Sequence, residues 1–315
     1  MNRLWAGLFV LIIIFTAGCS VTEPTTPTTP QSGNEIEGTQ ELQTFATFDE
    51  LQVFLTSQQQ GNQGTNTGAM FARSTVDMAF DGVAAMAESA PSAGGMVAQD
   101  VGSTNTQFAN VDEADFVKND NRYLYTLADN TLIIVDAADA PNAEVVSETE
   151  IFDSEDWQNQ AMDMFLHEDY VVVLAREGEE LITVRKYDIL PQTRYSEKTV
   201  AYVYDVRDRS SPELVSTTEV SGNYQQARMI DGVMYLIAQE YPWYGDLVIQ
   251  PRIAVDGIPV EPLYHYFDNP EESYNYNTVL SLDIETQEVL DSETYLLGHS
   301  STLMMNENNL YIAYQ

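Results

Sequence analysis

The sequence predicts an all-β fold, a β-propeller of four-stranded antiparallel blades, and three regularities indicate it. A turn dipeptide recurs directly before a run of alternating apolar residues, at 120–121 (DN), 168–169 (ED), 231–232 (DG) and 308–309 (NN). The third strand of each complete unit ends in aspartate, at Asp136, Asp205 and Asp283. A short apolar strand precedes each turn, and a Val-rich strand closes each unit. A β-sandwich would also give short strands, but not one four-strand order repeated along the chain.

Three units are complete and a fourth begins. The strands of the first unit read DFVK, RYLYTL, TLIIVD and AEVVSETEI, and later units repeat this order with insertions at 176–198 and 239–276. The sequence stops at Gln315, within the second strand of the fourth unit. Because propellers close with roughly four to eight blades, we expect a partial propeller over residues 104–315 and a truncated sequence.

Residues 1–19 are typical of an export signal that ends at a lipid-attachment cysteine. Arg3 supplies positive charge, residues 8–15 are apolar, and small residues precede Cys19, the only cysteine. We expect Cys19 to carry lipid and to hold an exported protein on the membrane at the cell surface. The alternative is a plain signal anchor with an unmodified thiol. The Thr- and Pro-rich residues 20–46 are expected to form an extended tether.

Residues 47–103 are expected to form a helix followed by a low-complexity loop. Thr47 and Glu50 have the spacing of a capping box, and Leu51, Phe54 and Leu55 form one apolar stripe. The pattern predicts that this helix ends near Gly61. A weaker helical pattern covers residues 76–86.

The charge of the chain is strongly acidic, with 49 Asp and Glu against 13 Lys and Arg, a net charge of −36. Such a chain repels phosphate backbones, which excludes nucleic acid as an expected partner. Acid-rich surfaces also suit a high-salt setting, where ions screen the repulsion.

The segment TNTQFANVDEADFVKNDNRYLYTL, residues 104–127, resembles the opening of the secreted, often archaeal, proteins with a C-terminal β-propeller domain. Their pattern is close to T-N-x-Q-x-x-G-V-D-E-x-D-x-V-K-x-D-G-x-Y-x-Y. This chain departs from it with Asn110 and Asn121 in place of glycine, and Asn tolerates left-handed backbone geometry nearly as well. The resemblance covers about residues 47–315. It implies the fold and leaves the function open.

Acidic side chains crowd this segment. Asp112, Glu113 and Asp115 precede the first strand of the first unit, and Asp120 lies in its turn. Closely spaced carboxylates suit calcium, but strand alternation directs Asp112 and Asp115 to different sides, and a turn aspartate accepts backbone amides locally. We expect structural roles for these acids, with a calcium site at Asp112, Glu113 and Asp115 or a catalytic role as alternatives. The Asp-ended third strands are likewise expected to cap turns.

The insertion 239–276 is the predicted ligand-binding segment, because it gathers aromatic rings in a long connection. Flat rings give contact area to a carbohydrate or a peptide at little entropic cost. The predicted ligand residues are Tyr241, Trp243, Tyr244, Tyr264, Tyr266 and Phe267. The alternative is a loop that packs its rings onto the propeller.

Enzyme signatures are scarce, so no catalytic residue is predicted. The three histidines, His167, His265 and His299, match no metal-protease motif, and GHSST at 298–302 lacks the spacing of a nucleophile elbow. We expect a binding or scaffolding module whose partner is an extracellular protein or carbohydrate, without a cofactor other than calcium. The alternative is an extracytoplasmic hydrolase or redox enzyme with its active site at the propeller mouth.

Overall fold

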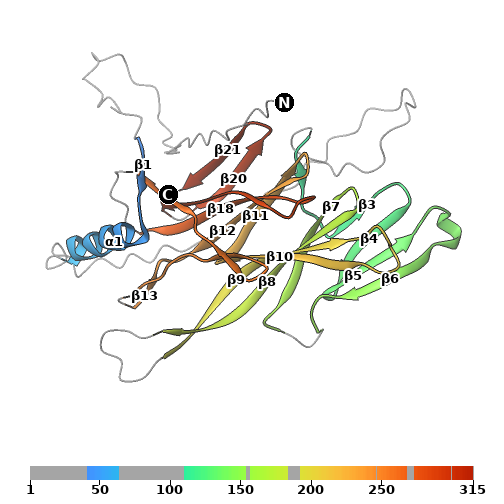
Figure 1. Ribbon diagram of the computed structural model, residues 1–315, viewed down its shortest axis with the longest axis horizontal. Coiled ribbons are helices and arrows are strands. Elements are labelled where there is room, and N and C mark those ends of the chain that lie inside the picture. The colour runs from blue at the N-terminus through green and yellow to red at the C-terminus, as the bar shows by residue number, and fades with distance from the viewer. Residues whose placement is uncertain are drawn as a thin grey trace, which may run out of the picture.

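The computed structural model describes residues 41–63, 110–153, 157–183, 192–245, 247–267, 273–298 and 300–314. The predicted signal segment, Cys19, most of the tether and the helical pattern at 76–86 lie outside the described residues. The described chain is built mainly of antiparallel strands, with one α-helix near its start (Figure 1).

Each predicted unit is a four-stranded blade, which confirms the β-propeller prediction. Blade one comprises β3 (Val117–Asn119), β4 (Tyr123–Ala128), β5 (Thr131–Asp136) and β6 (Glu144–Glu150). Blade two comprises β7 (Gln160–His167), β8 (Tyr170–Thr183), β9 (Gln192–Asp205) and β10 (Glu213–Ser221). Blade three comprises β11 (Asn223–Ile230), β12 (Val233–Glu240), β18 (Asn275–Asp283) and β19 (Val289–Leu297). The hairpin of β20 (Ser300–Asn306) and β21 (Asn309–Tyr314) begins the fourth.

Alternation along the strands explains how the blades stack, because successive side chains point to opposite faces of a sheet. In β8, Val171 and Val173 join a buried cluster with Tyr125 of blade one. Their neighbours Val172 and Leu174 join a second cluster that includes Leu236 and Leu280 of blade three. A third cluster packs Tyr295 of blade three against Leu310 and Ile312 of the fourth. Each blade therefore completes the core of the next.

Both insertions form strands instead of simple loops. The insertion 176–198 lengthens β8 and β9 into a two-stranded ribbon. The insertion 239–276 contains β13 (Trp243–Tyr244), β14 (Leu247–Val248), β15 (Ile253–Val255), β16 (Ile258–Val260) and β17 (Leu263–Phe267). β15 adds to the outer strand of blade two, and β17 adds in parallel to the outer strand of blade three. Outer strands carry unpaired backbone groups, which these additions satisfy.

The N-terminal elements dock on the outer edge of blade three (Figure 1). Residues 20–46 were predicted to be tether, but β1 (Leu42–Phe45) pairs with β17. The pairing is favourable because it satisfies the free edge of β17, and Phe45 is buried against the ring of Tyr266. The predicted helix is α1 (Phe48–Gln63), which begins at the predicted capping box and continues past Gly61.

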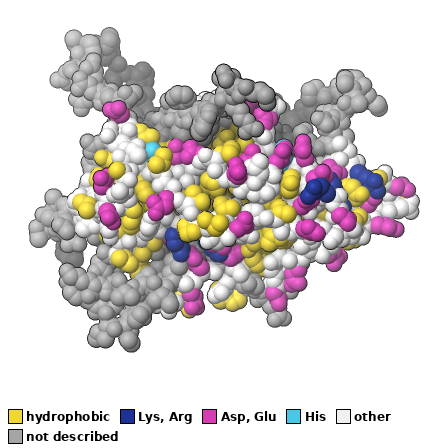
Figure 2. Space-filling view, viewed as in Figure 1, with side chains coloured by type: hydrophobic (Ala, Val, Ile, Leu, Met, Phe, Trp, Pro, Cys, Tyr) yellow, Lys and Arg dark blue, Asp and Glu magenta, His cyan; other side chains and the backbone are white. Residues whose placement is uncertain are grey.

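Acidic side chains are scattered over the face shown in Figure 2, among apolar and neutral groups, whereas Lys and Arg are confined to a few places. Among the described residues, no helix has the length and apolarity needed to cross a bilayer.

Candidate functional site

The acidic opening segment crosses between three blades. Its first part, β2 (Asp112–Glu113), pairs with β11 of blade three. Asp115 then forms a bridge with Met164 of blade two, with N–O distances of 3.1 and 2.9 Å. The segment finally enters blade one as β3. The crossing segment, residues 111–119, therefore joins the three blades near their first strands.

The carboxylates of the crossing segment have separate partners. Lys118, only 5% exposed, places its ammonium 2.8 Å from Asp112 and donates to the carbonyl of Glu113 at 2.6 Å. The Glu113 carboxylate lies 3.3 Å from Arg228, and Asp115 accepts the N–H of Phe116 at 2.7 Å. These contacts suit the structural role. Calcium at Asp112, Glu113 and Asp115 stays a prediction.

Backbone geometry explains why asparagine can stand at the two positions where the family pattern has glycine. Asn110 and Asn121 have φ angles of 69° and 73°, the left-handed region that favours glycine and, next to it, asparagine. Asn110 stands just before the crossing segment, and Asn121 forms the turn of blade one.

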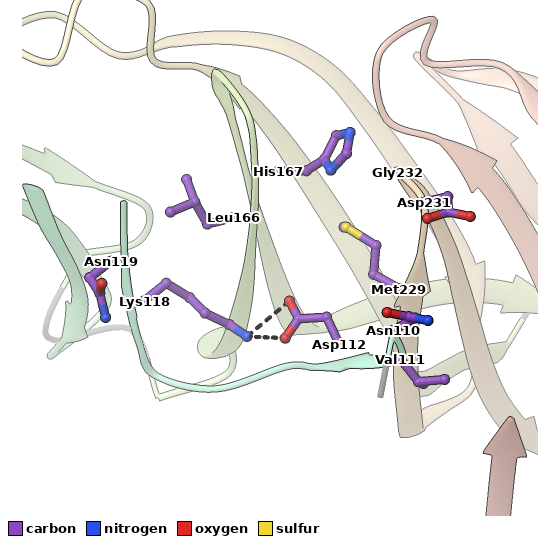
Figure 3. A pocket seen from close by; sticks show the side chains of 10 residues that line it. All are labelled: Asn110, Val111, Asp112, Lys118, Asn119, Leu166, His167, Met229, Asp231 and Gly232. Carbon is purple, nitrogen blue, oxygen red and sulfur yellow. Dashed lines mark hydrogen bonds and ion pairs between the residues drawn. The ribbon is translucent and has the colours of Figure 1, made fainter. Parts of the chain in front are cut away.

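A pocket of about 420 Å³ lies where the first strands of the three blades meet (Figure 3). The Lys118 and Asp112 side chains meet within it, and His167 lies on the side nearer to Gly232. The other lining residues are Asn110, Val111, Asn119, Leu166, Met229 and Asp231. The positive charge of Lys118 is paired with the Asp112 carboxylate. The Lys118 ammonium can donate hydrogen bonds but has no lone pair with which to accept one.

The predicted ligand residues of the insertion do not share one exposed surface. Tyr264 is 5% exposed, and Trp243 and Tyr266 pack against the same apolar cluster as helix α1. Phe267 packs against the cluster between blade three and the fourth. Tyr241 is 56% exposed, and Tyr244 is half-buried. The apolar stripe of helix α1 packs against these aromatic rings, and most of the predicted ligand residues are part of a buried cluster.

A different aromatic surface is exposed at blade two. Trp157, in the connection between blades one and two, is 83% exposed, and Tyr195, on the ribbon of β9, is 69% exposed. Both line a cleft of about 580 Å³ with Arg176 and the carboxylates Glu179, Glu180 and Glu197. Trp157 and Arg176 also line an adjoining cleft of about 410 Å³. That second cleft adds the polar side chains Asp129, Asn130, Asn159 and Gln160.

Arg176, like Trp157, lines both clefts, and its polar contacts are long. Its guanidinium lies 3.7 Å from Glu197 and 3.4 Å from the Gln160 side-chain oxygen. Among the described residues, its buried Nε has no hydrogen-bond partner. Beside it, the Glu180 carboxylate accepts the Tyr195 hydroxyl, which raises the pKa of Tyr195. The clefts therefore combine a free aromatic face with donors and acceptors that a polar ligand could engage.

Sequence reasoning missed this surface. Trp157 stands alone between two strands, and Tyr195 lies in the insertion 176–198, which was recognised only as a length difference. The available signal was a tryptophan among polar residues in a blade connection, in the run DWQNQ.

Blades of four antiparallel strands, stacked face to face around a shared pocket, define the β-propeller class. A family model for the beta propeller domain matches residues 101–315. This match covers more than half of the chain, and the protein therefore belongs to the beta-propeller domain family.

The chain is also similar to a protein of Archaeoglobus fulgidus that is described as an uncharacterized protein. The two are 23% identical over 231 residues, which cover 67% of this chain and 32% of the relative. The chain thus spans about a third of the length of this curated relative. No solved structure matched the chain.

Proposed function

We propose that this protein is an exported, lipid-anchored binding module that holds a carbohydrate at the cell surface through the two clefts beside Trp157. The observation that carries the proposal is the exposure of the Trp157 ring, which lines two adjoining clefts. A tryptophan ring offers a large, rigid contact area with a polar N–H at its edge, and here a second exposed ring, Tyr195, lines the same cleft. The side-chain amides, the carboxylates and Arg176 match the donors and acceptors of a polyhydroxylated ligand.

An enzyme at the propeller mouth is the alternative, and it could not use Lys118 as its nucleophile or base. Lys118 lines the central pocket, the pocket of about 420 Å³ where the first strands of the three blades meet. Lys118, the buried cation there, is held by Asp112 and by the carbonyl of Glu113. An ammonium in that state can neither attack a substrate nor accept a proton.

The proposed carbohydrate binding is tested by measuring how strongly the full-length protein is retained on immobilised carbohydrates from its own cell envelope. Trp157→Ala and Tyr195→Ala are each expected to weaken retention at least ~10-fold, as loss of an aromatic anchor does. Phe116→Ala is the matched control, because Phe116 is 60% exposed but lines neither cleft. Unchanged retention of Trp157→Ala would overturn the site.

The same assay separates the two aromatic surfaces. Loss of retention in a Trp243→Ala, Tyr244→Ala double variant, with Trp157→Ala unaffected, would transfer the site to the insertion 239–276. Capture of an envelope protein in place of carbohydrate would overturn the ligand class.

The anchor rests on the sequence of the first 40 residues: an apolar signal, a single cysteine and a Thr/Pro-rich spacer. It is tested on protein extracted with detergent from native membranes. A mass spectrum of the N-terminal peptide is expected to show Cys19 as the first residue and acylated. An unmodified thiol there would remove the anchor from the proposal.

A further inference from the structure

Three potential metal ligands from two blades meet at the edge of the central pocket. His167 ends β7 of blade two, Glu168 follows it in the turn, and Glu285 lies in the turn after β18 of blade three. One ligand atom from each lies within 4.8 Å of the others. His167 is half-buried, and both glutamates are exposed.

The distance between the imidazole of His167 and the carboxylate of Glu285 is long for a hydrogen bond. His167 Nε2 lies 3.5 Å from Glu285 Oε1, whereas N–H···O bonds are normally about 2.7–3.2 Å long. Two ligands that each lie about 2.0–2.2 Å from one tetrahedral ion are separated by roughly 3.3–3.6 Å. The observed spacing therefore matches that expected for two ligands of one ion.

The imidazole is held in place by the turn of blade three. A Cβ atom on Gly232 would lie 2.6 Å from His167 Nε2, so the ring sits directly against the glycine backbone (Figure 3). Gly232 also has a φ of 77°, and its carbonyl accepts the N–H of Ile284, next to Glu285. The turn at Gly232 thus contacts the imidazole of His167 and also holds Ile284, the residue that precedes Glu285.

We propose that His167, Glu168 and Glu285 bind one divalent transition-metal ion of the zinc type, which bridges blades two and three. An imidazole with two carboxylates is a ligand set that suits such ions, whereas Ca²⁺ and Mg²⁺ prefer oxygen alone. The imidazole distinguishes this group from the acids spread over the surface. The site is independent of the proposed carbohydrate clefts, none of whose lining residues it shares.

The test is a calorimetric titration of the full-length protein with Zn²⁺ in excess Mg²⁺, which saturates nonspecific carboxylates. We expect one tight site per chain. Changes around a metal ligand already cost roughly 10–100-fold in affinity, so His167→Ala and Glu285→Gln should each weaken Zn²⁺ binding at least that much. Bound Zn²⁺ should also raise the Tm, because it stabilises only the folded arrangement of the two blades.

Glu288→Gln is the matched control, since Glu288 is exposed in the same turn but outside the group of three. Full Zn²⁺ affinity in His167→Ala, or an equal loss in Glu288→Gln and Glu285→Gln, would overturn the site. Should His167→Ala fail to fold, Glu285→Gln decides, since that side chain is 59% exposed. The visible spectrum of the Co²⁺-loaded protein gives a second readout: four-coordinate intensity supports the site, and a hexaaqua-like spectrum overturns it.

Discussion

At the residue scale, the aspartates of the blade turns are fixed by local hydrogen bonds. Asp120 accepts the backbone N–H groups of Arg122 and Tyr123 at 3.2 and 2.8 Å, and the hydroxyl of Tyr125 at 2.8 Å. Arg209, from the turn of blade two, reaches the same carboxylate at 3.3 Å. Burial opposes ionisation of Asp120, but these donors together lower its pKa below the ordinary value. One turn residue thus links blade one to blade two.

Replacing Asp120 by Asn should lower the free energy of unfolding at pH 7, because charge-assisted hydrogen bonds are lost, by roughly 1.5–3 kcal/mol. A lowered folded-state pKa means that the contribution is complete above the unfolded value of about 3.9. It disappears as the pH falls through the folded pKa. Urea unfolding of both proteins between pH 7 and pH 3 should therefore show curves that converge in acid. Glu150→Gln, exposed on β6, is the control, and a gap that stays constant with pH would contradict the assignment.

The turn aspartates were predictable because they recur in each unit of the sequence. The clefts beside Trp157 were not, because no repeated pattern marks them. Asp136, Asp205 and Asp283 each accept the N–H two residues ahead, at 3.1, 2.9 and 3.0 Å, as the Asp-ended strands predicted. Trp157 has no counterpart in the other units, and its larger cleft is formed with residues of the β8–β9 ribbon, which lie apart from it in the sequence. The meeting of His167 with Glu285 spans two blades, and no local sequence pattern encodes it.

At the element scale, helix α1 and β1 act as an outer cover of blade three. The cap of α1 follows the sequence: Thr47 Oγ1 accepts the N–H of Glu50 at 3.3 Å, and the Glu50 carboxylate accepts the N–H of Ala46 at 2.9 Å. Leu51 and Leu55 are fully buried against the tyrosines of the insertion. The blade strands were predictable because alternation is local. The docking of α1 and β1 was not, because it pairs segments more than 200 residues apart.

Leu51→Ala should release this cover. Truncating a buried leucine costs about 2–5 kcal/mol through lost burial and a cavity. Because the helix packs at one edge, we expect local opening, seen as faster amide hydrogen exchange in α1, β1 and β17 with blade one unchanged. Val53→Ala on the same helix is the control, since Val53 is 71% exposed. Equal exchange in the two variants would mean that the burial of Leu51 does not hold the helix.

At the scale of the whole molecule, a net charge of −36 acts on blades that are held together by apolar faces and a few ion pairs. The crossing segment shows how scarce cations are used, since Lys118, one of three lysines, is buried at the junction of three blades. Lys and Arg occur in only a few places on the visible face, whereas acidic side chains are spread over it (Figure 2). Their mutual repulsion opposes the compact state.

Raising the salt concentration should therefore stabilise the protein. The Debye length falls from about 10 Å at 0.1 M to about 3 Å at 1 M, which screens the long-range repulsion more than the short, partly buried pairs. A gain of about 1–2 kcal/mol would raise the Tm by roughly 2–8 °C for a domain of this size. Thermal unfolding in NaCl and in KCl at equal ionic strength measures it, and screening predicts the same rise in both. A falling Tm would mean that ion pairs such as Arg209 with Asp120 and Asp169, and not the surplus of acid, dominate the electrostatics of the fold.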